Sequence, residues 1–400
     1  MASNGNILIK KSDSISDFER YLCDLNQVDR QITLPSTISA GGSLGVGGAL
    51  IQFLLTWSRH SKSRILKTFL NSNEDEELSD FVSRNYGLAA AYFADRVISD
   101  RSSAIDLRDF TLRAARGRIR AMFDGRIEET AKGREIEFAF VQGATREFHG
   151  SFYSRAPDEA EKRCPRKHGE LIRKSGELDR FCDRCMEFLG VKLVPQELFG
   201  LEFPFGTLFE EILRNTAEHA YLSETGEFYD RNFRSVRIAN VFVERHLMAA
   251  QTVSSSESRQ VAECYFLSHG EASDSATRTV NFLEITIQDS GPGFAATTPK
   301  DSTTEGLGER ELVARCFESY QSSKNFNVSG QGLQRILRVV DQLNGFLRVR
   351  TGGTEAFYAP VKGLDLEVNP INFVHDKLSE DVFLPRVEGT LVTVGIPIPR

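Results

Sequence analysis

Several features are scarce or missing in this sequence, and each absence excludes a class of protein. Six cysteines among 400 residues are too few for a disulfide framework. The longest uncharged run, residues 31–58, contains a proline and five glycines. Its dense apolar part, residues 49–57, is far shorter than the ~20 residues that a membrane-spanning helix needs. The N-terminus, MASNGNILIKK, lacks the apolar stretch of a signal peptide. We therefore expect a cytoplasmic protein that does not enter a membrane.

An excess of positive charge is also missing. The chain carries 49 Lys and Arg against 56 Asp and Glu, a formal net charge of −7. A mildly acidic chain is not an obligate binder of polyanions, so a nucleic-acid partner is not expected. What is present, 40% hydrophobic and 26% charged residues with 29 Phe, is typical of a globular protein. The length favours two to three domains.

The first hundred residues alternate between strand and helix patterns, which predicts an α/β domain over 1–100. The expected strands are 6–11, 32–35 and 64–70, and the expected helices are 14–25, 48–60 and 76–97. This order resembles the STAS-like domains of anti-sigma-factor antagonist proteins. The resemblance rests on the order of elements alone.

Residues 101–200 have a different character. They hold 20 Lys and Arg against 17 Asp and Glu, and Arg113, Arg116 and Arg120 recur on one helical face. Aromatic residues are not interleaved with the basic ones, which argues against a nucleic-acid surface. We expect a basic, partly helical connector that includes a hairpin at 135–153, around Gly143.

The strongest signals lie in 201–400. Residues 207–221, TLFEEILRNTAEHAY, place apolar side chains on one helical face. On the other side Glu211, Asn215 and Glu218 fall close together, so a carboxylate and a carboxamide stack one turn apart. A carboxamide oxygen suits Mg²⁺, and a neighbouring carboxylate can orient or deprotonate water.

A second motif follows residues 281–288, where apolar and polar side chains alternate as in a half-buried strand. The strand delivers Asp289 at its end, and Gly291 and Gly293 follow in the run DSGPG. An ionised carboxylate accepts hydrogen bonds only and can take one from an exocyclic amine. The glycines let backbone approach a flat ring.

The third motif opens a helix. Gly330, Gln331 and Gly332 precede a helical apolar face that starts at Leu333. A glycine-rich helix N-terminus presents free N–H groups to phosphate. Further on, Gly352 and Gly353 join two alternating strands, 346–351 and 354–358, as a hairpin. A last strand, 388–397, begins with Gly389 and Thr390.

In this order the motifs resemble those of the GHKL superfamily, the gyrase, histidine kinase and MutL-type ATPases with the Bergerat nucleotide-binding fold. The asparagine box is matched by Glu211, Asn215 and the following Glu218-His219. The first glycine box is matched by Asp289, Gly291 and Gly293. The second glycine box is matched by 330–333, and the closing Gly-Thr by 389–390. The resemblance implies a C-terminal Bergerat α/β sandwich with a mixed sheet over 201–400, under a lid at about 295–329.

The resemblance also implies the ligands, ATP and Mg²⁺. Asn215 would hold Mg²⁺, Asp289 would bind the adenine amine, and 330–333 would cradle the phosphates. Thr390 would complete the nucleotide site. Lys324 of the lid and His219 would reach phosphates. His219 and Tyr221 make the helix most similar to the anti-sigma-factor kinase and histidine kinase branches. The 74-residue separation of Asn215 and Asp289 is longer than in the compact kinases, so 222–280 must contain an insertion or long loops.

These features predict an ATP-dependent regulatory switch, a slow ATPase in which Glu211 positions water and the nucleotide state controls a protein partner. Two alternatives stay open. One is a protein kinase acting on Ser or Thr of a small STAS-like partner, and the other is a scaffold that binds nucleotide without hydrolysis. A homodimer also stays open, although no dimerising two-helix bundle is evident.

A lesser signal is a set of four residues of zinc-ligand type within 22 residues: Cys164, His168, Cys182 and Cys185. The last two lie in a helical pattern, DRFCDRCMEFLG. We favour ordinary thiols over a structural zinc site.

Overall fold

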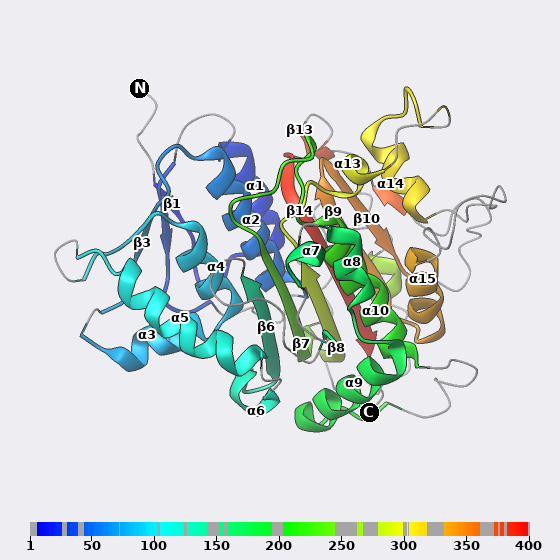
Figure 1. The fold of residues 1–400 in the computed structure, drawn as a ribbon, viewed down its shortest axis with the longest axis horizontal. Helices are drawn as coiled ribbons and strands as arrows, with labels where there is room; N and C mark the ends of the chain where they lie inside the picture. Colours follow the sequence, from blue (N-terminus) through cyan, green and yellow to red (C-terminus); the bar gives the residue numbers. More distant parts are fainter. Residues whose placement is uncertain are drawn as a thin grey trace.

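The computed structural model has a mixed α/β fold built on one parallel and one antiparallel sheet (Figure 1). The structure describes residues 6–25, 30–38, 44–71, 73–101, 105–123, 126–141, 152–154, 158–162, 164–193, 203–244, 262–266, 279–298, 302, 304–317, 332–360, 372–374, 377–379 and 382–398. Among these residues, no helix is both long enough and apolar enough to cross a bilayer.

The N-terminal layer, as we call β1–β4 with α1–α4, is the parallel part. Its strands pair in chain order: β1 (Ile7–Leu8), β2 (Ile32–Leu34), β3 (Ile65–Thr68) and β4 (Arg96–Ser99). Its helices are α1 (Ile15–Leu25), α2 (Val46–His60), α3 (Asp75–Val82) and α4 (Asn85–Phe93). The alternating α/β pattern expected for 1–100 is therefore confirmed.

The single helix expected over 76–97 is wrong, because the chain forms α3, α4 and β4 there. Asn85 starts a new helix by binding the large sheet: its side chain donates to the carbonyls of Phe138 (3.0 Å) and Val236 (3.1 Å). Gly87 then lies so close to the Phe81 carbonyl that a Cβ would overlap it. These contacts are tertiary, so the helical spacing of apolar residues did not reveal the break.

The second sheet has eight strands in the order β11-β10-β9-β14-β8-β7-β6-β5. Their bounds are β5 (Ala131–Lys132), β6 (Glu135–Val141), β7 (Phe233–Glu244), β8 (Thr279–Gln288), β9 (Phe346–Gly352), β10 (Thr354–Tyr358), β11 (Asn372–Val374) and β14 (Val387–Pro397). The predicted hairpin at Gly352-Gly353 is confirmed, since β9 and β10 pair antiparallel across it. A separate pair is formed by β12 (Lys377–Ser379) and β13 (Val382–Phe383).

The structure does not have the mixed sheet expected for 201–400. Every described strand pair in the eight-stranded sheet is antiparallel. The reason is the position of β14. It enters between β8 and β9 and runs antiparallel to both. A long-range insertion of this kind cannot be recognised from local patterns.

The large sheet also begins earlier in the chain than the motifs suggested. Strand β6 lies within the segment expected to be a connector, yet it pairs along its length with β7. The turn before it is at Gly133, whose φ of 62° is in the left-handed region that favours glycine. Residues 142–151 of the hairpin expected around Gly143 lie outside the described residues, and at its far end Tyr153 forms an isolated antiparallel bridge with Ile172.

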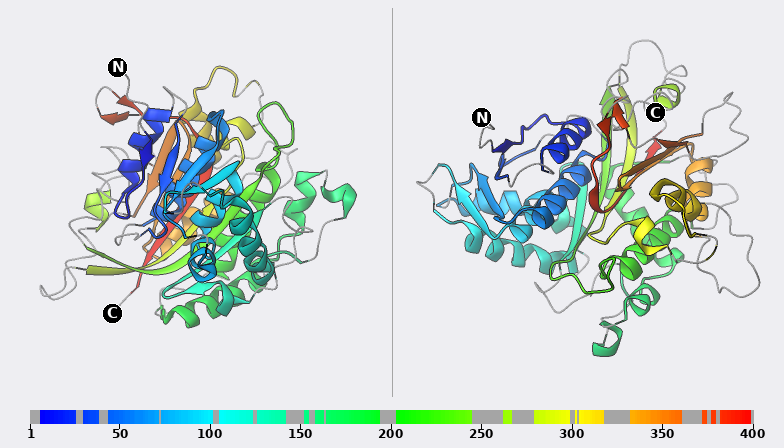
Figure 2. Two further views of the ribbon diagram at one scale, coloured as in Figure 1. Left: turned by 90° about the vertical axis from the view of Figure 1, so that its left-hand side faces the viewer. Right: turned by 90° about the horizontal axis from the view of Figure 1, so that it is seen from above.

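Helices cover both faces of the large sheet (Figure 2). On one face α10 (Pro204–His219) packs against α8 (Pro165–Glu170), α9 (Ser175–Leu189) and α15 (Gly332–Gln342). On the other face α2 packs on β14 and β8, with α1 and α4 beside it. The remaining helices are α5 (Arg108–Phe123), α6 (Ile127–Thr130), α7 (Glu159–Lys162), α13 (Phe294–Thr297) and α14 (Glu309–Phe317).

The polar side of β8 is consequently buried, where the alternating pattern predicts a half-buried strand. Glu284 and Gln288 are fully buried and Thr286 is 3% exposed. Gly48 of α2 lies directly against Thr286 and Leu391, too close for any side chain at that position. The glycine-rich entry to α2 thus serves close packing between the layers.

A buried ion pair also joins the two layers. Arg350 of β9 and Glu19 of α1 are 0% and 3% exposed. The guanidinium donates one hydrogen bond to each carboxylate oxygen, at 2.8 and 3.0 Å. Arg350 also donates to the carbonyls of Gly352 and Pro385. A bidentate pair of this kind fixes the angle between the partners as well as their distance.

Removing one partner of this pair should be costly. We expect Glu19→Ala to lower the free energy of unfolding by about 3–5 kcal/mol, because it leaves the buried Arg350 guanidinium without its bidentate carboxylate partner. Arg20→Ala on the same helix is the control. Arg20 is largely exposed beside Asp17, so this change should cost less than about 1 kcal/mol. Urea unfolding measures both, and equal losses in the two variants would contradict a structural role for the buried pair.

Candidate functional site

The motifs found in the sequence converge at one end of the large sheet. Asp289 follows β8, Gly291 and Gly293 continue from it, and Thr390 lies beside it in β14. Helices α10 and α15, which carry Glu211 and Gly332, pack against each other next to this point. Helix α10 thus has Gly291 of the Asp289 loop at its C-terminal end and Gly332 beside Glu211, about two turns earlier.

The chain holds Asp289 in a defined setting, which we call the Asp289 cradle and define as Asp289–Gly291 together with Gly389–Thr390. Oδ1 of Asp289 accepts hydrogen bonds from the N–H groups of Gly291 (2.8 Å) and Thr390 (3.1 Å). Two backbone bonds, Asp289 N–H to Thr390 O (3.0 Å) and Gly389 N–H to Gly291 O (2.9 Å), join its two halves. Oδ2 has no hydrogen-bond partner among the described residues.

Burial dominates the electrostatics of this carboxylate. Asp289 is only 8% exposed, and this desolvation raises its pKa from 3.8 to about 6. The two backbone N–H donors and the nearby charges of Arg234 and Arg59 oppose the shift without cancelling it. A largely buried carboxylate with a raised pKa and one oxygen without a described partner is a candidate for ligand binding.

The glycines of the first glycine box allow close approach. A Cβ on Gly291 would lie 2.9 Å from Cα of Ala220, just past the end of α10. Gly293 has a φ of 93°, and a Cβ there would lie 2.7 Å from Oγ1 of Thr351. Gly389 lies against the Asp289 carbonyl, again with no room for a side chain. These three positions let the loop, α10 and β14 pack together.

The structure brings Glu211 to the start of α15. A Cβ on Gly332 would lie 2.5 Å from Oε2 of Glu211, and Oε1 accepts from Arg335 of α15 at 2.8 Å. Glu211 itself is 7% exposed. Its carboxylate is therefore oriented and lies directly beside the segment that the resemblance assigns to phosphates.

Two further residues of α10 face the same region. Asn215 is half-buried, one turn from Glu211, and none of the described residues hydrogen-bonds its carboxamide. His219 ends the helix as an exposed residue, and desolvation of its ring by the surrounding protein lowers its pKa. At neutral pH the imidazole is thus mainly uncharged and can donate one hydrogen bond.

Some expected site residues cannot be placed. Lys324, Gly330 and Gln331 lie outside the described residues, as does much of the expected lid, 295–329. The described parts of that segment include α13 and α14, which pack on each other. Leu333, in the first turn of α15, is partly buried against the main core.

Sequence reasoning missed two arginines near Asp289. Arg234 of β7 is 4% exposed and donates to the hydroxyls of Tyr153 (2.7 Å) and Tyr221 (2.9 Å). Arg59, at the end of α2, donates to the backbone of the cradle. For α2 a signal exists, because Gln52, Thr56 and Arg59 form a polar stripe on an otherwise apolar helix. No comparable signal marks Arg234.

The residues of zinc-ligand type do not assemble into a described site. Cys182 and Cys185 are buried in α9, and burial raises the pKa of both thiols, that of Cys185 to about 12. Such thiols are protonated at neutral pH, whereas zinc binds the thiolate. Cys164 is half-buried, and the side chain of His168 lies outside the described part of the chain. Within that part, no group of three or more His, Cys, Asp or Glu is placed to hold a metal ion.

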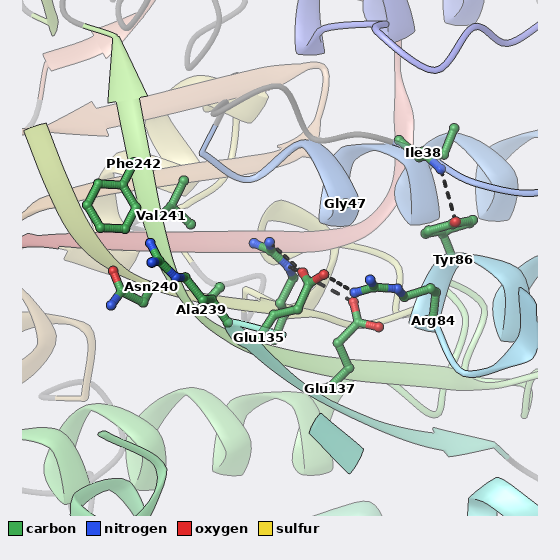
Figure 3. Close-up of a pocket in the computed structure, with 12 residues that line it drawn as sticks. Ile38, Gly47, Arg84, Tyr86, Glu135, Glu137, Ala239, Asn240, Val241 and Phe242 are labelled. Atoms are coloured by element: carbon green, nitrogen blue, oxygen red, sulfur yellow. Dashed lines mark hydrogen bonds and ion pairs between the residues drawn. The ribbon is translucent and has the colours of Figure 1, made fainter. Parts of the chain in front are cut away.

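A cavity of about 250 Å³ lies elsewhere, between the N-terminal layer and strands β6 and β7 (Figure 3). Most of its charged side chains bind each other: Glu135 pairs with Arg84 and with Arg237, and the latter pairs with Glu284 as well. The cavity is lined by none of the motif residues. Arg134, which also lines the cavity, has no carboxylate partner among the described residues and lies over the ring of Phe242. We place the candidate site at the Asp289 cradle because the motif residues lie there.

Comparison with known proteins adds no relative. No protein-family model, no curated protein and no solved structure matches this chain. Function is therefore inferred from the residues and their geometry.

The strained state of Asp289 predicts a pH-dependent stability. Because its pKa is higher in the folded than in the unfolded chain, the folded protein is penalised above pH 6, and the penalty is relieved as the pH falls toward 4. A shift from 3.8 to about 6 corresponds to ~3 kcal/mol. Asp289→Asn keeps an oxygen for the two N–H donors, so we expect it to raise the free energy of unfolding at pH 7.5 by up to ~3 kcal/mol.

Urea unfolding at pH 7.5, 6 and 5 checks this expectation, and the gain should shrink as the pH falls. Asp13→Asn is a matched control, because Asp13 is also buried and also accepts two hydrogen bonds on one oxygen, from Lys10 N–H (2.8 Å) and the Tyr21 hydroxyl (2.9 Å), but it lies before α1 in the N-terminal layer. That variant should not be stabilised. An Asp289→Asn protein less stable than wild type at pH 7.5 would refute the strained carboxylate.

Proposed function

We propose that this chain binds ATP with Mg²⁺ at the Asp289 cradle and acts as a regulatory switch with slow ATPase activity. The observation that carries the proposal is the state of Asp289: one carboxylate oxygen is held by two backbone N–H groups, and the other has no described partner. A free acceptor in a largely buried setting suits an exocyclic amine such as that of adenine.

The groups around the cradle are suited to bind the Mg²⁺ ion and the phosphates of the nucleotide. Asn215 provides an oxygen of the type that Mg²⁺ accepts, one turn along α10 from Glu211. Glu211 lies against Gly332, at the start of the helix that the GHKL resemblance assigns to phosphates. A carboxylate held in place by Arg335 can orient the water that attacks a phosphoryl group. The nucleotide state would then be transmitted to a protein partner.

Mutants at the two ends of the ligand should fail in different ways. Asp289→Asn places a donor opposite the adenine amine, and we expect affinity for a non-hydrolysable ATP analogue to fall by about 5- to 150-fold, since such a mismatch costs ~1–3 kcal/mol. Asn215→Ala should weaken binding only when Mg²⁺ is present. Calorimetric titration with and without Mg²⁺ measures both effects, with Asp13→Asn as the control. Wild-type affinity in Asp289→Asn would overturn the assignment of the adenine site.

Turnover should depend on Glu211. We expect Glu211→Gln to bind the ATP analogue as wild type does and to lose about 10²–10⁴-fold in hydrolysis rate, because a general base acts in the transition state. Glu210→Gln is the control: this neighbour is also buried, but it accepts from Ser175 N–H (2.7 Å) and pairs with Arg214. It should affect stability and spare turnover.

The same assay separates the competing functions. With γ-labelled ATP, release of free phosphate supports the ATPase, and label on a partner protein supports a Ser/Thr kinase. Binding with neither product supports a scaffold. Unchanged hydrolysis in Glu211→Gln would remove the proposed mechanism while leaving nucleotide binding intact.

A further inference from the structure

The end of α2 reaches into the backbone of the Asp289 cradle. The guanidinium of Arg59 donates to the carbonyl of Ser290 and, at 3.5 Å, to that of Gly291. It also pairs with the carboxylate of Glu388 and lies 3.7 Å from the centre of the Tyr229 ring. Its side chain is 18% exposed. One cation from the N-terminal layer is thus enclosed by backbone, carboxylate and aromatic groups of the large sheet and its loops.

These partners lie on both sides of the cradle. Ser290 and Gly291 follow Asp289 directly, and Gly291 supplies one of the two N–H donors to its carboxylate. Glu388 precedes Gly389 and Thr390, and Thr390 supplies the other donor. By binding Ser290, Gly291 and Glu388 at once, Arg59 ties together the two segments that hold Oδ1 of Asp289.

The same face of α2 adds further contacts. Thr56 accepts from Glu388 N–H (3.0 Å), and Gln52 donates to Gly389 O (3.4 Å) and Arg350 O (3.1 Å). A Cβ on Gly389 would lie 3.0 Å from Leu55. Residues 52, 55, 56 and 59 form one helical stripe, so α2 contacts the cradle as a rigid body and not through a single side chain.

We infer that Arg59 is a positioning residue of the nucleotide site, and that through it the N-terminal layer controls how tightly the site binds nucleotide. This inference rests on the proposed function. It assigns α2 a role beyond packing: a displacement of α2 would release the Ser290 and Gly291 carbonyls together with Glu388. Only the backbone hydrogen bonds between the two halves of the cradle would then hold Asp289, and its orientation would be less fixed.

The positive charge of Arg59 gives a second way to test its contact with the cradle, through the pH dependence of binding. The charged groups that act on Asp289 are Arg234 from β7 and Arg59 from α2, and Glu388 and His60 lie next to Arg59. Both arginines favour the ionised carboxylate. Without the Arg59 charge, protonation of Asp289 begins at a higher pH, and binding that requires the carboxylate is lost at a higher pH as well.

The experiment compares three variants of the full chain with wild type, using a non-hydrolysable ATP analogue and Mg²⁺. Arg59→Met removes the charge and the donors, so we expect affinity to fall at least about tenfold at pH 7.5. We also expect the pH midpoint for loss of binding to rise. Arg59→Lys retains the charge but lacks the several N–H donors of the guanidinium. We therefore expect weaker binding with an unchanged pH midpoint for loss of binding. Titration of the analogue itself is common to all variants and cancels in the comparison.

Arg64→Met is the matched control, because Arg64 is also an ion-paired arginine of the N-terminal layer but contacts Asp95 instead of the cradle. It should bind within about twofold of wild type. If Arg59→Met does not fold in a thermal melt, Arg59→Lys and Glu388→Gln decide the question, and both should lower affinity. Wild-type affinity and pH midpoint in the folded Arg59 variants would overturn the inference alone. Absence of binding by the wild-type protein would overturn the proposed function, and the inference with it.

Discussion

Helix α2 is largely buried, and its packing on the polar face of the large sheet holds the N-terminal layer against that sheet. One side of the helix meets α1 and α4, and the other meets β14 and β8. Covering that face buries the charges of Glu284 and Arg350, each of which must then find a partner within the protein. The pairs Arg237–Glu284 and Arg350–Glu19 supply partners across strands and across layers. The interface between the layers is therefore specified by charge as well as by shape.

The candidate site is built from the ends of these same elements. Burial disfavours the ionised form of Asp289 and raises its pKa to about 6, and one of its carboxylate oxygens lacks a described partner. The backbone donors of Gly291 and Thr390 hold it in one orientation, and Arg59 holds the segments that carry them. A site whose ligand group is oriented in advance loses less conformational freedom when the ligand binds.

Local patterns were sufficient for most elements and for the candidate residues. Periodicity predicted α1, α2, α10 and α15, and glycine pairs predicted the β9–β10 hairpin, because side-chain spacing and turn chemistry are properties of short segments. The structure also brings Glu211 beside Gly332, and Thr390 beside Asp289, as the order of motifs required. Local patterns failed at 76–97, where Asn85 starts a new helix by binding two strands distant in sequence.

Residue type and short spacing were enough to predict the α/β class of the first hundred residues and to select Glu211, Asn215 and Asp289 as candidate site residues. Only the tertiary structure decided that β6 joins the large sheet, that β14 lies between β8 and β9, and that the polar side of β8 is covered by α2. It also decided that Arg59 contacts the Asp289 cradle more than 200 residues away. Such pairings depend on how whole helices and sheets pack against each other. Packing between segments that are distant in sequence cannot be predicted from the residues of one segment.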